Sequence, residues 1–270
     1  MTDLMHADAV AATAVADARR AARAAGVTVR ELAGVEEQAD VVRLLSEIWG
    51  RGADNPVVPP ELLRAFGKAG NYVAGAFAGD ELVGATIGFH STPERHTLHS
   101  HIAGVTPAYA GHAVGFAMKL HQRGWALARG IDVIEWTFDP LVARNAYFNI
   151  AKLRAVPTEY LANFYGAMAD AINGGDDTDR LLVRWALRDA QVAAAATGLT
   201  ASVPSSAPGH VAVPVPADIE GLRAVASPRA RQWRSEVRER LTELLAGGGR
   251  IVGFDRTAGY IVRVGEESTR

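Results

Sequence analysis

The sequence contains no cysteine among its 270 residues. Because disulfide bonds, thiolate metal sites and cysteine nucleophiles all require a Cys sulfur, the sequence excludes each of them. Positive and negative charges are nearly balanced, with 28 Lys and Arg residues and 30 Asp and Glu residues, for a formal net charge of -2. This balance gives no electrostatic reason to expect nucleic acid or an anionic membrane as a partner.

Long hydrophobic runs are also missing, although 49% of the residues are hydrophobic. No apolar run approaches the roughly 20 residues that a membrane-spanning helix needs, so we expect no membrane insertion. The length and composition are typical of a globular protein with one large domain, or with one domain and an added unit.

The N-terminal segment, residues 1–26, is rich in alanine. A secretory signal places positive charge before its apolar region, whereas here Asp3, Asp8 and Asp17 precede or interrupt that region. We therefore interpret the segment as a helix or an arm, and we expect a cytoplasmic protein.

Strand and helix patterns alternate between residues 27 and 189. Apolar residues such as Val41, Leu44 and Leu45 recur at helical spacing, and the turn at Gly79-Asp80 joins two β-rich runs into a hairpin. This order predicts an α/β fold, with a mixed sheet flanked by helices. The predicted strands lie at 27–35, 71–78, 81–90, 97–105, 131–138 and 180–187, and the predicted helices end near 49, 66, 129 and 153.

The composition changes at residues 190–209, which are rich in Ala, Ser, Pro and Gly. We interpret this stretch as a linker between a domain at 27–189 and a small C-terminal α/β extension at 210–270. The extension is predicted to contain a strand at 211–215, helices within 217–245 and a strand at 250–254.

The stretch "VTPAYAGHAVGFAMK", residues 105–119, joins a predicted strand to a predicted helix. Residues 110–115 would present successive unpaired N–H groups at the positive end of the helix dipole, where anions bind. Gly111 and Gly115 lack a Cβ, so a ligand could approach the backbone closely. The same residues also fit an ordinary helix start that packs against a strand.

His99 and His101 lie two residues apart on the preceding strand, so both side chains leave the same face. An imidazole titrates near pH 6.5 and can accept a proton at neutral pH. The alternative for each histidine is a packed, hydrogen-bonded side chain. A metal site would need more ligands, but nine residues along a helix, a rotation of about 900°, place His112 and His121 on opposite sides, and we expect no metal.

Three stretches carry a resemblance to a known family: "LHSHIAGVTPAYAGHAVGFAMKLHQRGWALARGI", "WTFDPLVARNAYFNIAKL" and "DRLLVRWAL". Residues 27–187 resemble the GNAT superfamily of acyl-CoA-dependent N-acyltransferases, and the match is best with a bacterial branch of predicted acetyltransferases. The tail from residue 211 resembles an extension carried by that branch. The resemblance implies a mostly antiparallel GNAT sheet and acetyl-CoA, or another acyl-CoA, as the co-substrate.

The resemblance also implies which residues hold the co-substrate. The backbone of Ala103 and Val105 would pair with the pantetheine arm like an added strand, and Asn145 matches a position that contacts the pantetheine region. The residues whose backbone amides would face the CoA pyrophosphate are Ala110, Gly111, His112, Ala113, Val114 and Gly115.

The loop departs from the family pattern, Arg/Gln-x-x-Gly-x-Gly/Ala. Ala110 stands at the Arg/Gln position and Ala113 at the first glycine position, whereas Gly115 fills the last. Losing one charge-assisted contact, about 2 kcal/mol, would weaken CoA binding about thirtyfold without abolishing it.

For catalysis, the resemblance implies a base on the histidine strand and a tyrosine acid on the helix after the fifth strand. We favour His101 over His99 as the base. Tyr147 is the candidate acid, although it lies one turn ahead of the usual family position, which Ile150 occupies here. Tyr160 and Tyr165 are possible substitutes. Two carboxylates near the rim, Glu135 and Asp139, could hold an amine, and Asp139 could equally cap a helix.

We therefore expect an acyltransferase that moves an acetyl or other acyl group to a small-molecule acceptor, with an amine favoured. One alternative keeps the fold but uses the His99/His101 pair in a lyase, decarboxylase or isomerase. Another is a non-catalytic ligand-binding module. The C-terminal extension could complete the acceptor pocket or form a homodimer.

Overall fold

The computed structural model describes residues 2–52, 54–166, 176–199 and 203–265. The strands are β1 (Thr28–Glu31), β2 (Tyr72–Ala78), β3 (Glu81–His90), β4 (Thr97–Val105), β5 (Val133–Phe138), β6 (Val156–Leu161), β7 (Arg180–Ala186), β8 (His210–Val213), β9 (Arg250–Asp255) and β10 (Gly259–Arg263). The helices are α1 (Thr2–Ala24), α2 (Val35–Ile48), α3 (Pro60–Lys68), α4 (Val114–Leu127), α5 (Ala143–Ala146), α6 (Ala190–Ala196), α7 (Ile219–Ala224) and α8 (Pro228–Ala246). Short 3₁₀ turns lie at Pro93–Arg95 and Pro107–Tyr109, and a π-helical segment, Tyr147–Lys152, continues α5.

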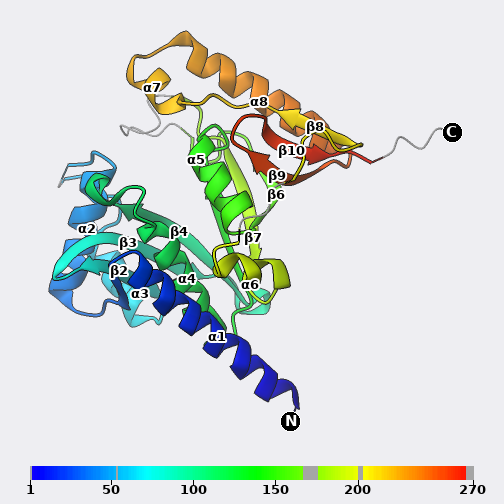
Figure 1. The fold of residues 1–270 in the computed structure, drawn as a ribbon. Helices are drawn as coiled ribbons and strands as arrows, with labels where there is room; N and C mark the ends of the chain where they lie inside the picture. Colours follow the sequence, from blue (N-terminus) through cyan, green and yellow to red (C-terminus); the bar gives the residue numbers. More distant parts are fainter. Residues whose placement is uncertain (1, 53, 167–175, 200–202, 266–270) are drawn as a thin grey trace. The chain divides into compact units, whose positions relative to one another are not determined.

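The first seven strands form one mostly antiparallel sheet in the order β1-β2-β3-β4-β5-β7-β6. Figure 1 labels its neighbouring strands β2, β3 and β4. Strands β4 and β5 pair in parallel, and the remaining three strands form a separate sheet in the order β8-β10-β9. The predicted fold class, a mixed and mostly antiparallel sheet flanked by helices, is confirmed. No described helix combines the length and apolar character that a membrane span requires.

The chain forms two compact units. The first unit consists of Met1–Trp136 with Ala186–Thr197, and it contains β1–β4, most of β5, α1–α4 and α6. The second unit consists of Thr137–Trp185 with Gly198–Arg270, and it contains α5, β6, most of β7 and the later elements.

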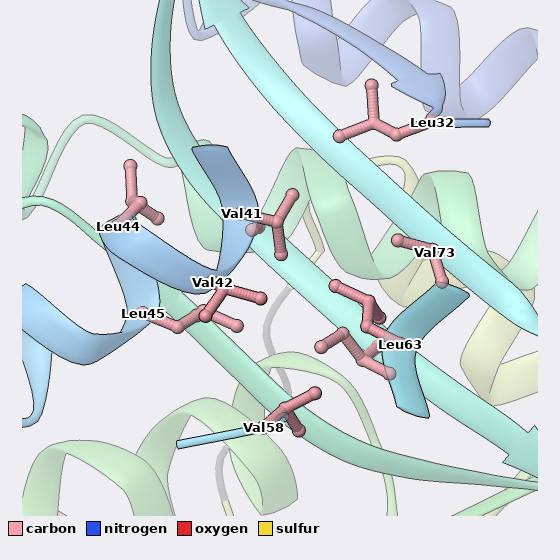
Figure 2. Close-up of a cluster of buried hydrophobic side chains, with 10 residues drawn as sticks. Leu32, Val41, Val42, Leu44, Leu45, Val58, Leu63 and Val73 are labelled. Carbon is pink, nitrogen blue, oxygen red and sulfur yellow. The ribbon is translucent and has the colours of Figure 1, made fainter. Parts of the chain in front are cut away.

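Helices α2 and α3 cover one face of the sheet in the first unit. Their apolar side chains meet those of β2 and β3 in a buried cluster, and Figure 2 shows Leu45 of α2 and Leu63 of α3 within it, both fully buried. The helical spacing of Val41, Leu44 and Leu45 in the sequence predicted the amphipathic helix α2 whose apolar residues lie in this cluster. The buried members are Leu32, Val41, Val42, Leu44, Leu45, Val58, Leu63, Val73, Ala85 and Ile87.

Helices α1 and α4 cover a second cluster in the first unit, against other residues of β2 and β3. The two helices approach closely, because a Cβ added at Gly124 of α4 would lie 3.2 Å from the side chain of Val15 in α1. The alanine-rich N-terminal segment is thus helical from Thr2 to Ala24, and its helix packs against α4.

Two segments differ from the prediction. Residues 190–196, predicted as the start of a linker, form α6, which Asp189 caps by accepting a hydrogen bond from the Gln191 N–H at 2.7 Å. Strand β6 was not predicted; it contains Pro157, which cannot donate a backbone hydrogen bond within a sheet. Its position at the sheet edge in the strand order explains why a proline is tolerated there.

Candidate active site

The parallel strands β4 and β5 pair over only three residues, from Thr97 with Val133 to His99 with Glu135. Beyond that point, no described residue of β5 pairs with β4, although β3 continues to pair with β4 as far as Val105. The edge of β4 that faces away from β3 is therefore open from residue 100 to residue 105.

A β-bulge lies where this opening begins. Ile87 of β3 pairs with Ile102 and the next residue, Gly88, pairs with Ser100, so His101 is the extra residue in β4. Bulges bend a strand and redirect a side chain, and they are frequent beside active sites. His101 is exposed, in contrast to the buried Ser100 before it.

The turn between β4 and α4 presents unused backbone donors. The N–H groups of Ala110 and His112 donate within the turn, to Pro107 O at 3.1 Å and Tyr109 O at 3.3 Å. No described residue accepts a hydrogen bond from the N–H groups of Gly111, Ala113, Val114 and Gly115. These four donors lie at the start of a 14-residue helix, where the helix dipole favours an anion.

Ala113 caps α4 in the left-handed conformation, with φ 61° and ψ 11°. Its Cβ makes this conformation unfavourable, which glycine would avoid. We expect Ala113→Gly to raise the free energy of unfolding of the first unit by about 1 kcal/mol, measured by urea denaturation. Ala110→Gly is the matched control, because Ala110 is extended at φ -62° and gains nothing from glycine. Equal effects of the two variants would contradict the expectation.

The two candidate histidines lie together beside Phe89 of β3. The ring centroids of His99 and His101 are 6.1 Å apart, and they lie 4.9 Å and 5.7 Å from the Phe89 ring. Burial, then the charges of His101, Lys119 and Arg95, lower the pKa of His99 to about 4. Part of the His101 ring is shielded from water although the residue reaches solvent, and this partial burial lowers the pKa of His101. Both imidazoles are therefore neutral at pH 7, and either could accept a proton.

The remaining predicted site residues belong to the second unit. Asn145 lies in α5, and no described residue hydrogen-bonds its side chain. Tyr147 begins the π-helical segment. The Arg256 guanidinium stacks on its ring, with Cζ 4.1 Å from the ring centroid. The structure thus brings His99 and His101 together in the first unit, on the strand that leads to the turn, whereas the contributions of Asn145 and Tyr147 stay predictions.

The two substitute tyrosines have other partners. The Tyr160 hydroxyl donates to Asp179 Oδ2 at 2.5 Å, and burial followed by this bond raises the pKa of Tyr160. The Tyr165 hydroxyl lies 3.3 Å from Thr137 Oγ1. Of the rim carboxylates, Glu135 accepts a hydrogen bond from Arg95 at 2.8 Å.

Asp139 belongs to a buried ion-pair cluster within the second unit. Its carboxylate accepts hydrogen bonds from Arg223 at 2.7 Å and from Arg234 at 3.0 Å, and both arginines also bind Asp176. It also accepts from the Leu141 N–H at 2.9 Å. The helix-capping alternative for Asp139 is wrong, because α5 begins at Ala143 and its N-cap is Val142; the Asp139 carboxylate instead binds two arginines and the Leu141 N–H in the preceding turn.

Comparisons with known proteins agree on one family. A family model described as "Acetyltransferase (GNAT) domain" matches residues 11–149, which is more than half of the chain. A candidate acetyltransferase from Acinetobacter baylyi has a similar structure, with 14% identity and a TM-score of 0.50 over 61% of this chain and 94% of that one. A search of curated proteins finds no relative.

Two other solved structures show comparable likeness. The ribosomal-protein-S18-alanine N-acetyltransferase of Escherichia coli is 12% identical, with a TM-score of 0.47 over 61% of this chain and 96% of that one. A candidate acetyltransferase from Salmonella typhimurium, solved with its cofactor acetyl-CoA, is 19% identical, with a TM-score of 0.47 over 61% of this chain and 96% of that one.

The co-substrate predicted from the sequence agrees with the family match, because GNAT acetyltransferases use acetyl-CoA. The open edge of β4 and the four unused N–H groups fit a ligand of that kind, since they offer strand pairing and anion binding from the main chain. With the match over residues 11–149 and this fold, the chain belongs to the GNAT acetyltransferase family.

Proposed function

We propose that this acetyltransferase transfers the acetyl group of acetyl-CoA to the amine of a small molecule, with His101 as the base. One observation carries the proposal: the open edge of β4 begins at the bulged His101 and leads to the turn with four unused N–H groups. A base, a strand edge and an anion site thus follow one another along a single stretch of chain.

The main chain would hold acetyl-CoA, which supplies the activated acyl group. The N–H groups of Gly111, Ala113, Val114 and Gly115 would bind the pyrophosphate, in place of the side chains that the family pattern offers. The backbone of Ala103 and Val105 lies on the open edge and would pair with the pantetheine arm. All these roles use backbone atoms, so the alanines at positions 110 and 113 do not remove them.

His101 suits the role of base better than His99. An attacking amine must lose a proton, and a neutral imidazole within reach can accept it. A pKa of about 4 makes His99 the weaker proton acceptor, and its strand position still pairs with β5. His101 stands at the bulge and is exposed. Asn145 keeps its proposed role as a pantetheine contact, and Tyr147 stays the proton donor that the family resemblance implies.

Acetyl-CoA binding tests the proposal directly. We expect heat of binding in calorimetry with the wild-type chain, and a loss of affinity of about tenfold or more in Gly115→Asp, because a carboxylate would then repel the pyrophosphate. The fold should tolerate the change, since a Cβ at Gly115 would have Val105 Cγ2 at 4.0 Å as its nearest neighbour, and an acidic residue favours a helix start.

Gly115→Asn is the matched control, because it has the same shape without the charge. Its affinity for acetyl-CoA should stay within a few fold of wild type. Absence of binding to the wild-type chain at millimolar acetyl-CoA would overturn the proposed function. Equal affinities of the Gly115→Asp and Gly115→Asn variants for acetyl-CoA would show that the turn does not bind the pyrophosphate.

A further inference from the structure

A buried lysine lies where β4 and β5 separate. Lys119 of α4 is 7% exposed, and its Nζ donates to Ser100 Oγ at 2.9 Å and to Gln122 Oε1 at 3.2 Å. The same Nζ lies 3.7 Å from the centroid of the Trp136 ring. Ser100 and Trp136 directly follow His99 and Glu135, the last paired residues of the two strands.

No described carboxylate forms an ion pair with Lys119, although buried lysines are almost always paired. The acidic side chains on the adjoining elements form ion pairs with arginines instead. Glu135 of β5 binds Arg95, and Asp17 of α1 binds Arg20 at 2.8 Å and Arg123 at 3.7 Å. His99 on β4 lies close enough for the Lys119 charge to lower its pKa, and it is neutral at pH 7.

The position of Lys119 along the chain relates it to the proposed co-substrate. Lys119 lies one helical turn after Gly115, on the same face of α4. Five residues of strand, roughly 16 Å, separate Ser100 from Val105, where the turn with the unused N–H groups begins. An extended pantetheine arm has a similar length, so a thiol whose pyrophosphate is bound at the turn would reach the point where the strands separate.

We propose that Lys119, through the hydroxyl of Ser100, supplies the proton that the CoA sulfur takes up when it leaves the acyl group. This inference rests on the proposed function. As the bond from the acyl carbon to the acceptor nitrogen forms and the bond to sulfur breaks, Ser100 gives its hydroxyl proton to the sulfur and takes one from the Lys119 ammonium. The proton that His101 removes from the amine returns to solvent, and Lys119 takes one up from solvent.

Burial lowers the pKa of Lys119 to about 7, so a large share of the molecules carries the proton at neutral pH and can give it up easily. This matches what a general acid needs, a pKa near the working pH. Tyr147 is the donor implied by the family resemblance, whereas Lys119 and Ser100 lie in the first unit, beside the opening itself.

The thiol of bound CoA reports on Lys119 without any acceptor. Because the protein has no cysteine, the ultraviolet absorbance of a thiolate in the complex comes from CoA alone. We expect the bound thiol to be at least tenfold more acidic in wild type than in Lys119→Met, which keeps the length of the side chain but removes the charge. Ser100→Ala should reduce the difference, and CoA affinity should change little.

Nuclear magnetic resonance provides a second measurement. It uses the wild-type chain, so it does not depend on whether a Lys119 variant folds. The sequence has three lysines, Lys68, Lys119 and Lys152, so isotope-labelled lysine side chains give few signals. The Lys119 signal should shift with CoA but not with desulfo-CoA, while Lys68 serves as an internal control. Equal thiol acidity in wild type and Lys119→Met, or equal shifts with both ligands, would overturn the inference. Absence of CoA binding would overturn the proposed function as well.

Discussion

A His101→Gln variant is expected to lose two to four orders of magnitude, roughly, in kcat for acetyl transfer while keeping its affinity for acetyl-CoA. Glutamine has a similar reach but cannot take the proton of the attacking amine. The measurement is the release of the CoA thiol, read with a thiol reagent, over a panel of primary amines. Because the chain has no cysteine, the reagent reacts with the product alone.

Two further substitutions and the pH profile sharpen this test. His99→Gln should lower kcat less than His101→Gln does, and His90→Gln on the neighbouring strand should leave kcat nearly unchanged. Burial lowers the pKa of His101, so the imidazole stays neutral somewhat below pH 6.5. The kcat should therefore hold as the pH falls to 6.5 and decline only as it passes the lowered pKa. A full rate in His101→Gln would refute the assignment.

Replacing Asp139 by alanine is expected to destabilise the second unit by about 3–5 kcal/mol, the usual effect of removing one partner from a buried ion pair. Arg223 and Arg234 are 6% and 3% exposed, and they would be left with Asp176 as their shared carboxylate. Hydrogen exchange measures the effect where it occurs, because it reports protection for each element separately. Protection should fall in α8 and remain in α4.

The exposed pair Arg240–Glu243 provides the control, since it lies on the same helix and its side chains are 47% and 69% exposed. Removing this pair should lower the free energy of unfolding by less than about 1 kcal/mol.

The contribution of Asp139 to stability depends on pH. Burial alone would raise the pKa of Asp139, but Arg234, Arg223 and the Leu141 N–H outweigh it and lower that pKa. The stability from Asp139 is therefore present above about pH 4, the unfolded value, and declines as acid brings the pH through the lowered pKa. An Asp139→Ala variant as stable as the control would exclude this role.

Much of the first unit could be predicted because its signals are local. The Gly79-Asp80 turn predicted the β2–β3 hairpin, and the spacing of Val41, Leu44 and Leu45 predicted the buried face of α2. The stretch from Val105 to Lys119 likewise showed a strand, a turn and a helix start. Each of these depends on residues that are close in sequence.

The features that were missed depend on residues far apart in the chain. The bulge at His101 follows from its register with Ile87 and Gly88, which strand alternation alone does not reveal. Lys119 was not among the predicted site residues, and its partner Ser100 is 19 residues away. Asp139 and Arg234 are 95 residues apart, so no local pattern could join them.

The extra residue in β4 has a consequence for how this family member can diverge. Ser100 and Ile102 already pair with Gly88 and Ile87, which are neighbours on β3, so deleting residue 101 would leave both pairs in register. The deletion would restore the regular ladder and remove the bulge, together with the bend and the redirected side chain that a bulge provides. In descendants of this chain, the strand can therefore shorten by this one residue and keep its pairing, but the position that holds the imidazole would be lost.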